Sequence, residues 1–98
     1  MNENNKEVIA MAIYRFAGYG TEVKEYPIIN ETEKSYVVIK ENNNKSRIPK
    51  EEVGKAIHHM CDSFPYVRVY LHNATGLDAR EEIAKWFENE ANCIRRRG

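Results

Sequence analysis

Hydrophobic and polar residues alternate strictly along the stretch Tyr66–His72. Successive side chains of a strand point to opposite faces, so this stretch predicts a strand with one apolar face and one face of aromatic and basic side chains. Short runs rich in β-branched and aromatic residues, bounded by Gly, Pro or Asn, predict further strands in the N-terminal half, arranged as an antiparallel meander. These runs are residues 8–16, 21–29, 35–41 and 45–48.

After Pro49 the spacing of hydrophobic residues changes to three and four, which is typical of one face of a helix. Proline suits the first turn of a helix, and the acidic residues that follow it suit the positive end of the helix dipole. We therefore expect a short helix between Pro49 and the Ser63-Phe64-Pro65 stop signal, weakened by Gly54. Its apolar stripe is Val53, Ala56, Ile57 and Met60.

The C-terminal segment predicts a longer amphipathic helix that begins at a capping-box-like pair, Asp78 and Glu81. The chain as a whole therefore predicts an α+β fold: an antiparallel four- to five-stranded meander sheet with one short helix and a C-terminal amphipathic helix packed on it. We expect residues 1–98 to form a single domain, with residues 1–6 frayed. The stripe of the long helix is Ala79, Ile83, Phe87, Ala91 and Ile94, with Trp86 beside it.

Composition excludes several classes of protein. The 98 residues carry 15 basic and 15 acidic side chains, so no global attraction to nucleic acid or membrane is expected. A hydrophobic share of 42% with 31% charged residues is typical of a globular chain. Two cysteines without a disulfide-scaffold density favour a reduced cytoplasmic setting, and no apolar run is long enough to span a bilayer.

The mixed face of Tyr66–His72 is the first candidate binding surface, because aromatic rings stack on bases and a guanidinium binds phosphate. A half-exposed strand face and a protein interface are the alternative interpretations of the same residues. Arg15 adds to this surface if it shares a face with Arg68, and is otherwise a surface residue at a strand end. The C-terminal arginines either close over a ligand, for instance across a dimer, or simply stabilise the end of the helix. The candidate ligand-binding residues are Arg15, Tyr66, Arg68, Tyr70, Trp86, Arg95, Arg96 and Arg97.

Neither a metal site nor a catalytic site has a supporting motif. Zinc ligands usually come in closely spaced Cys or His pairs, and no CxxC or HxxxH pair is present. The sequence also lacks the nucleophile-elbow, P-loop, dinucleotide-binding and HExxH motifs. We therefore expect no cofactor, no metal and no enzymatic activity. The residues that prompted the zinc question are His58, His59, Cys61, His72 and Cys93.

In three segments, Thr21–Tyr26, Lys34–Val38 and Arg47–Lys55, the chain resembles small accessory proteins carried by phages of Gram-positive bacteria. Within that group its layout loosely resembles the anti-Thoeris sponge proteins. The resemblance implies an N-terminal antiparallel sheet, C-terminal helical elements, and binding without cleavage of a cyclised ADP-ribose signal between protomers by arginines and an aromatic residue. Arg15, Tyr70 and the arginines of the final helix stand in comparable places. The resemblance also implies that the cytoplasm in question is that of a bacterial host cell.

These observations lead to one hypothesis and two alternatives. The hypothesis is a non-enzymatic counter-defence protein that sequesters a nucleotide-derived signal, with the arginines on phosphates and Tyr70, aided by Tyr66 or Trp86, stacked on the base. So small a domain offers little enclosed volume, so the hypothesis includes a homodimer or higher oligomer. The first alternative is a protein that blocks a host defence effector, in the manner of anti-CRISPR proteins. The second is a small RNA-binding module.

Overall fold

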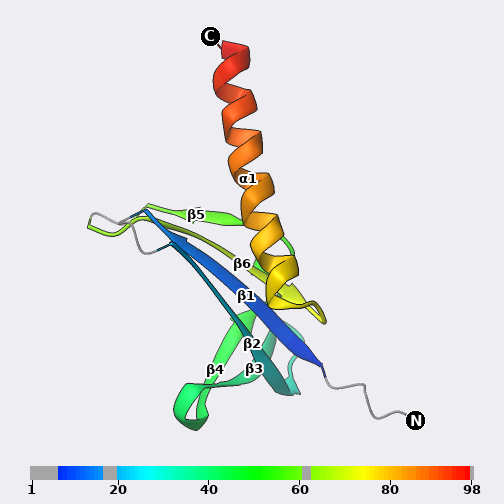
Figure 1. The fold of residues 1–98 in the computed structure, drawn as a ribbon. Coiled ribbons are helices and arrows are strands. Elements are labelled where there is room, and N and C mark those ends of the chain that lie inside the picture. The colour runs from blue at the N-terminus through cyan, green and yellow to red at the C-terminus, as the bar shows by residue number, and fades with distance from the viewer. Residues whose placement is uncertain (1–6, 17–19, 61–62, 98) are drawn as a thin grey trace.

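The computed structural model describes residues 7–16, 20–60 and 63–97 of the chain. It confirms an α+β fold, a curled antiparallel sheet that carries one long helix (Figure 1). Residues 1–6, expected to fray, lie outside the described part. The elements are β1 (Val8–Arg15), β2 (Gly20–Glu31), β3 (Ser35–Lys40), β4 (Asn44–Pro49), β5 (Ile57–His59), β6 (Tyr66–His72), α1 (Gly76–Arg97) and two short 3-10 turns, η1 (Glu41–Asn43) and η2 (Lys50–Glu52).

The sheet has six strands in the order β4-β3-β2-β1-β6-β5, so the expected count of four to five was too low. The 12-residue strand β2 joins its two halves: its first part pairs with β1 and its last part pairs with β3. The register shifts between Ile28 and Asn30, directly after Pro27, a residue that lacks the N–H a continuous ladder needs. This change of partner within one strand curls the sheet into a half-barrel.

The short helix expected over residues 49–60 was wrong. Its first turn is only the 3-10 turn η2, and its end is the edge strand β5, which pairs antiparallel with β6. Between them Gly54 has φ +107°, a conformation that ends a helix, and its backbone N–H donates to the carbonyl of Tyr70 at 2.7 Å. Pairing with β6 therefore overrides the helical spacing, and Met60, expected on an apolar stripe, is 80% exposed.

Asparagine and glycine occupy turn positions as predicted. Asn42 and Asn43, between β3 and β4, have φ of 63° and 59° in the left-handed region that asparagine tolerates. Gly20 has φ +75° at the start of β2. The rest of the turn predicted between the first two strands, residues 17–19, lies outside the described part.

The two faces of the sheet carry separate hydrophobic clusters. On the inner face of the curl, residues from β1, β2, β3, β4 and β6 form one cluster that fills the half-barrel. On the outer face, β1 and β6 pack against α1. The buried residues of the inner cluster are Ile9, Met11, Ile13, Tyr26, Val38, Ile48 and Tyr70. Those of the outer cluster are Ala10, Ala12, Val67, Val69, Ala79 and Ile83.

The helix α1 begins three residues earlier than a cap at Asp78 implied. Thr75 is the cap: its hydroxyl accepts from the N–H of Asp78, and the Asp78 carboxylate accepts from the N–H of Thr75, both at 3.1 Å. This is the reciprocal geometry of a capping box. The N–H of Gly76 donates to the Glu25 carboxylate on β2 at 2.8 Å, which fixes the start of the helix against the sheet.

Burial along the apolar stripe of α1 falls from one end to the other. Ala79 and Ile83 are 0% and 3% exposed, Phe87 and Ala91 are half-buried, and Ile94 is 70% exposed. A helix of 22 residues is about 33 Å long, and its C-terminal half extends beyond the sheet (Figure 1). No helix in the described part of the chain is long and apolar enough to cross a bilayer.

Candidate functional site

Four of the eight predicted site residues share the inner face of the sheet. Arg15 lies opposite Tyr66 in the β1–β6 ladder, and Arg68 and Tyr70 follow on the same face of β6. Arg15 and Arg68 are diagonal neighbours in this ladder, a spacing of about 7–8 Å. The condition set by the sequence, that the two arginines share a face, is therefore met.

Both guanidiniums are already paired with carboxylates. Arg15 Nη1 donates to Glu22 Oε1 on β2 at 2.9 Å, and Arg68 Nη2 donates to Glu52 Oε1 on η2 at 3.3 Å. The hydrogen bond from Arg15 lowers the pKa of Glu22 from its usual value. Lys24, next along β2, lies 3.6 Å from Glu22 and pairs with Glu41. Cations and carboxylates thus alternate across this face, so a phosphate bound there would lie close to carboxylates as well as guanidiniums.

The two tyrosines also have neighbours on their rings. Tyr70 is 6% exposed, and the Arg68 guanidinium lies over its ring at 4.8 Å from the centroid. Burial raises the pKa of the Tyr70 hydroxyl. Tyr66 stacks on His59 with ring centroids 4.6 Å apart and an interplanar angle of 21°. A base cannot stack on Tyr70 without opening the inner cluster, whereas Tyr66 can offer only the face that His59 leaves.

The remaining predicted residues lie elsewhere. Trp86 packs on the outer face with the cluster under α1, so it cannot join Tyr66 and Tyr70 around one ligand. Arg95 is exposed on the protruding end of α1, where its Nη1 donates to Asn92 Oδ1 at 3.4 Å. The helix continues through Arg96 and Arg97, whose side chains are outside the described part of the structure. Within one chain, the arginines of the helix end are therefore separated from Arg15 and Arg68.

The histidines and the cysteine that the structure describes do not assemble around a common point. Among the described residues, no group of three or more His, Cys, Asp or Glu side chains is close enough to hold a metal ion, and Cys61 lies outside them. His59 is notable for another reason: its Nε2 is buried without a hydrogen-bond partner. Burial, followed by the nearby Arg68 charge, lowers the pKa of His59 from 6.5.

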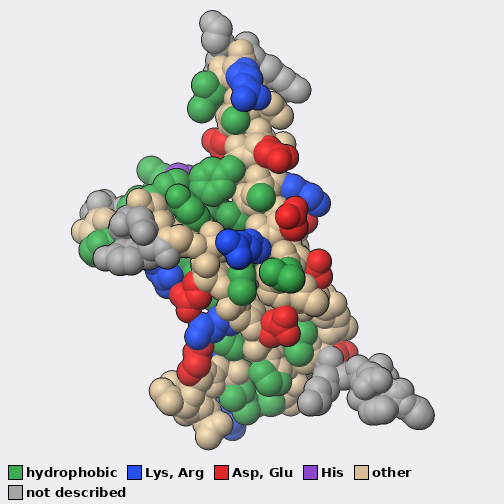
Figure 2. Space-filling model, in the orientation of Figure 1, with side chains coloured by type: hydrophobic (Ala, Val, Ile, Leu, Met, Phe, Trp, Pro, Cys, Tyr) green, Lys and Arg blue, Asp and Glu red, His purple; other side chains and the backbone are tan. Residues whose placement is uncertain are grey.

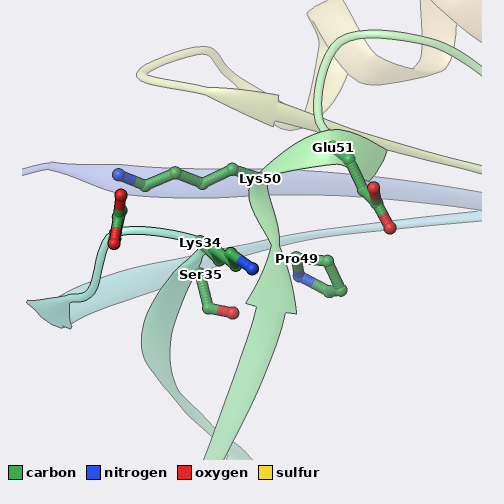
Figure 3. A pocket seen from close by; sticks show the side chains of 6 residues that line it. Lys34, Ser35, Pro49, Lys50 and Glu51 are labelled. Atoms are coloured by element: carbon green, nitrogen blue, oxygen red, sulfur yellow. The ribbon is translucent and has the colours of Figure 1, made fainter.

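An open hollow of about 510 Å³ lies where β3 begins and β4 ends (Figure 3). The residues that line it are Glu33, Lys34, Ser35, Pro49, Lys50 and Glu51. Lys50 lies over the Tyr36 ring at 5.1 Å and pairs with Glu31 at 2.5 Å. The lining of the hollow contains two lysines and two glutamates, so the hollow has no strong preference for a charged ligand.

The densest group of aromatic rings lies on the outer face, where α1 leaves the sheet. Phe87 is the centre of this group, with edge-to-face contacts to Tyr14 at 5.1 Å, Trp86 at 5.0 Å and Phe16 at 5.9 Å. His58 on β5 completes it, 5.3 Å from Trp86 and 5.4 Å from Phe16. Each edge-to-face aromatic pair stabilises the fold by about 0.5–1.5 kcal/mol beyond the effect of burial, so the rings of this cluster hold one another in place.

Exposed hydrophobic residues continue from this cluster to the end of the sheet. Phe16, Met60 and Phe64 are 42%, 80% and 63% exposed, and we call them the apolar tip. The N–H of Phe16 donates to the carbonyl of Pro65 at 3.2 Å, and His59 pairs with Tyr66, so all three residues belong to one end of the sheet. Figure 2 shows hydrophobic side chains gathered where the helix leaves the sheet. Exposed apolar side chains at one end of a molecule are a candidate interaction site.

Sequence reasoning missed the tip and the carboxylates of the inner face. Phe64 served only as part of a helix stop signal and Met60 as part of a helical stripe. A large aromatic residue directly before a proline, outside any strand, was the available signal for an exposed hydrophobic group. For Glu22 and Glu52 no signal existed, because their pairing with Arg15 and Arg68 depends on the strand register and on the fold of residues 50–54.

Comparison with known proteins found no matching family model, no matching curated protein and no matching solved structure.

Proposed function

We propose that the protein is a non-enzymatic binding module that blocks a protein of the bacterial defence machinery, which is the first of the two alternatives drawn from the sequence. The proposal rests on the apolar tip, whose residue Phe16 contacts the aromatic cluster around Phe87. Aromatic residues and methionine are enriched at the centres of protein interfaces, where they supply most of the binding energy. The inner face, by contrast, has its arginines bound to carboxylates, which favours a structural role for those residues.

The tip has the features of a rigid anchor. Phe16 contacts Tyr14 at 5.2 Å, Phe87 and His58, so its ring is held before any partner arrives. Side chains that are ordered in the free protein lose little conformational entropy on binding, which improves affinity without new contacts. Met60, at the same end of the sheet, has an unbranched and polarisable side chain that can adapt its shape to a partner.

Affinity capture from a lysate of a Gram-positive host, with the purified protein as bait, tests the proposal. Phe64→Ser removes an exposed apolar group from the tip, and Leu77→Ser removes an equally exposed one, 69% against 63%, from the start of α1. We expect one protein to be retained by the wild type and by Leu77→Ser and to be lost by Phe64→Ser. Capture that is the same with both variants, or no capture by the wild type, would overturn the proposal.

A second candidate, sequestration of a nucleotide-derived signal, is favoured by one observation: Arg15, Tyr66 and Arg68 share a face. Its test is calorimetry with cyclic nucleotides and ADP-ribose isomers, together with mass spectrometry of small molecules released on heating. Binding that Arg68→Ala removes and Glu52→Gln strengthens would support this candidate, because the carboxylate competes for the guanidinium. Absence of any heat evolved and of any released nucleotide would exclude it.

A further inference from the structure

The end of α1 presents an apolar stripe that the sheet of the same chain does not cover. Ala91 is half-buried and Ile94 is 70% exposed, and both continue the line of Ala79, Ile83 and Phe87 at helical spacing. Figure 2 shows hydrophobic side chains on one flank of the protruding helix as well. We call residues 88–97 the helix extension.

A helix extension of this length is poorly stable by itself. Helices shorter than about 12–15 residues are marginal in water, and most helical stability in proteins comes from packing of an apolar face. The extension has an apolar face, but nothing in its own chain packs against that face. It is held only because it continues the half of α1 that packs on the sheet. A partner that covers Ala91 and Ile94 would supply the missing packing.

We propose that this partner is a second copy of the chain, whose helix extension packs antiparallel against the first. This inference concerns a different surface from the apolar tip, and it does not depend on the proposed target. The small side chain of Ala91 at the centre allows the two helices to approach closely. In an antiparallel pair centred near Ala91, Ile94 of each copy lies against the Phe87 region of the other.

The charges of the helix favour the antiparallel direction. At 100° per residue, Glu88 and Arg95 flank the stripe on the same side. When two helices pack antiparallel, the residues that flank the stripe on one side of the first helix face the residues on the same side of the second. Glu88 of one copy therefore lies near Arg95 of the other, and this pair occurs twice in the dimer. A parallel pair would instead set the arginine-rich ends of the two helices side by side, and like charges destabilise.

The same geometry sets the strength of the dimer. Stable interfaces bury at least about 1,200 Å², and two ten-residue helix segments with the neighbouring aromatic residues offer at most an interface at the low end of that range. We therefore expect a reversible dimer with a dissociation constant in the micromolar range. Because the flanking pairs are exposed, added salt should weaken it. A dimer would also display two apolar tips and raise the avidity for any target with two sites.

Sedimentation equilibrium over a wide range of protein concentration tests the inference. The wild type should dimerise, and Ile94→Asp should raise the dissociation constant about tenfold or more, because it places a charge in the apolar contact. Leu77→Asp, on the same helix and equally exposed, should not change it. Circular dichroism checks that each variant keeps its fold.

A charge exchange tests the direction of the pair and remains informative if Ile94→Asp misfolds. Glu88→Arg alone and Arg95→Glu alone should each weaken the dimer about two- to fivefold, and the double exchange should restore it. A protein that stays monomeric at every concentration, or a dimer that Ile94→Asp does not weaken, would overturn the inference. So would a double exchange that fails to rescue dimerisation.

Discussion

Two isoleucines on the same stripe of α1 allow a matched test of how the helix is docked. Ile83 is 3% exposed against β1 and β6, whereas Ile94, three turns further on, is 70% exposed. The substitutions Ile83→Ala and Ile94→Ala remove the same atoms and change helix propensity by the same amount. Any difference between them therefore reports packing alone.

The magnitudes follow from burial. Each buried methylene-sized group contributes about 0.8 kcal/mol, so truncating a fully buried isoleucine to alanine loses about 2.4 kcal/mol, and the cavity left behind adds to this loss. The better helix propensity of alanine returns about 0.4 kcal/mol. We expect Ile83→Ala to lower the free energy of unfolding by about 2–4 kcal/mol. For Ile94, with under a third of its surface buried, loss and gain nearly cancel and the net change stays within about 0.5 kcal/mol.

Urea denaturation followed by circular dichroism measures both values, provided that the slope m is unchanged between variants. The protein must be dilute enough to be monomeric, because a dimer would add its own stabilisation at Ile94. If Ile94→Ala costs as much as Ile83→Ala in dilute solution, the end of the helix is packed against its own sheet. If Ile83→Ala costs less than about 0.5 kcal/mol, the helix is not docked at all.

Two further predictions concern the helix cap and the half-buried His59. Thr75→Ala removes the hydroxyl that accepts from the Asp78 N–H, so we expect a loss of about 1 kcal/mol in the free energy of unfolding; an unchanged urea midpoint would contradict the capping box. Because burial and Arg68 lower the pKa of His59 from 6.5, the unfolded chain binds the proton more readily, and the stability contributed by neutral His59 should fall as pH decreases below 6.5. His59→Gln should flatten this part of the curve of melting temperature against pH, and a slope equal to that of the wild type would refute the assignment.

Much of the fold could be predicted because local patterns and tertiary contacts agree. The alternation in Tyr66–His72 identified strand β6 and its two faces, and Val67 and Val69 do lie beneath the helix. Residues 49–60 show the opposite case. Val53, Ala56, Ile57 and Met60 have helical spacing, but Gly54 adopts a positive φ and the chain hydrogen-bonds to β6 instead. The pairing of this segment with strand β6 leaves no mark on local periodicity.

The candidate site was less predictable, because it depends on register. The alternation placed Tyr66, Arg68 and Tyr70 on one face, and the β1–β6 ladder adds Arg15 to it. The sequence could not indicate that Glu22 and Glu52 would hold both guanidiniums. Nor could it indicate where the sheet ends beneath α1, which decides that Ile94 is exposed while Ile83 is buried.

Backbone amide hydrogen exchange along α1 tests most directly the claim that half of this helix is docked and half is available for binding. In dilute solution, amides up to the region of Phe87 should be well protected, and those of residues 88–97 should exchange much faster, since only the first half packs on the sheet. Raising the protein concentration should slow exchange in the extension selectively. Equal protection along the whole helix in dilute monomer would contradict the account.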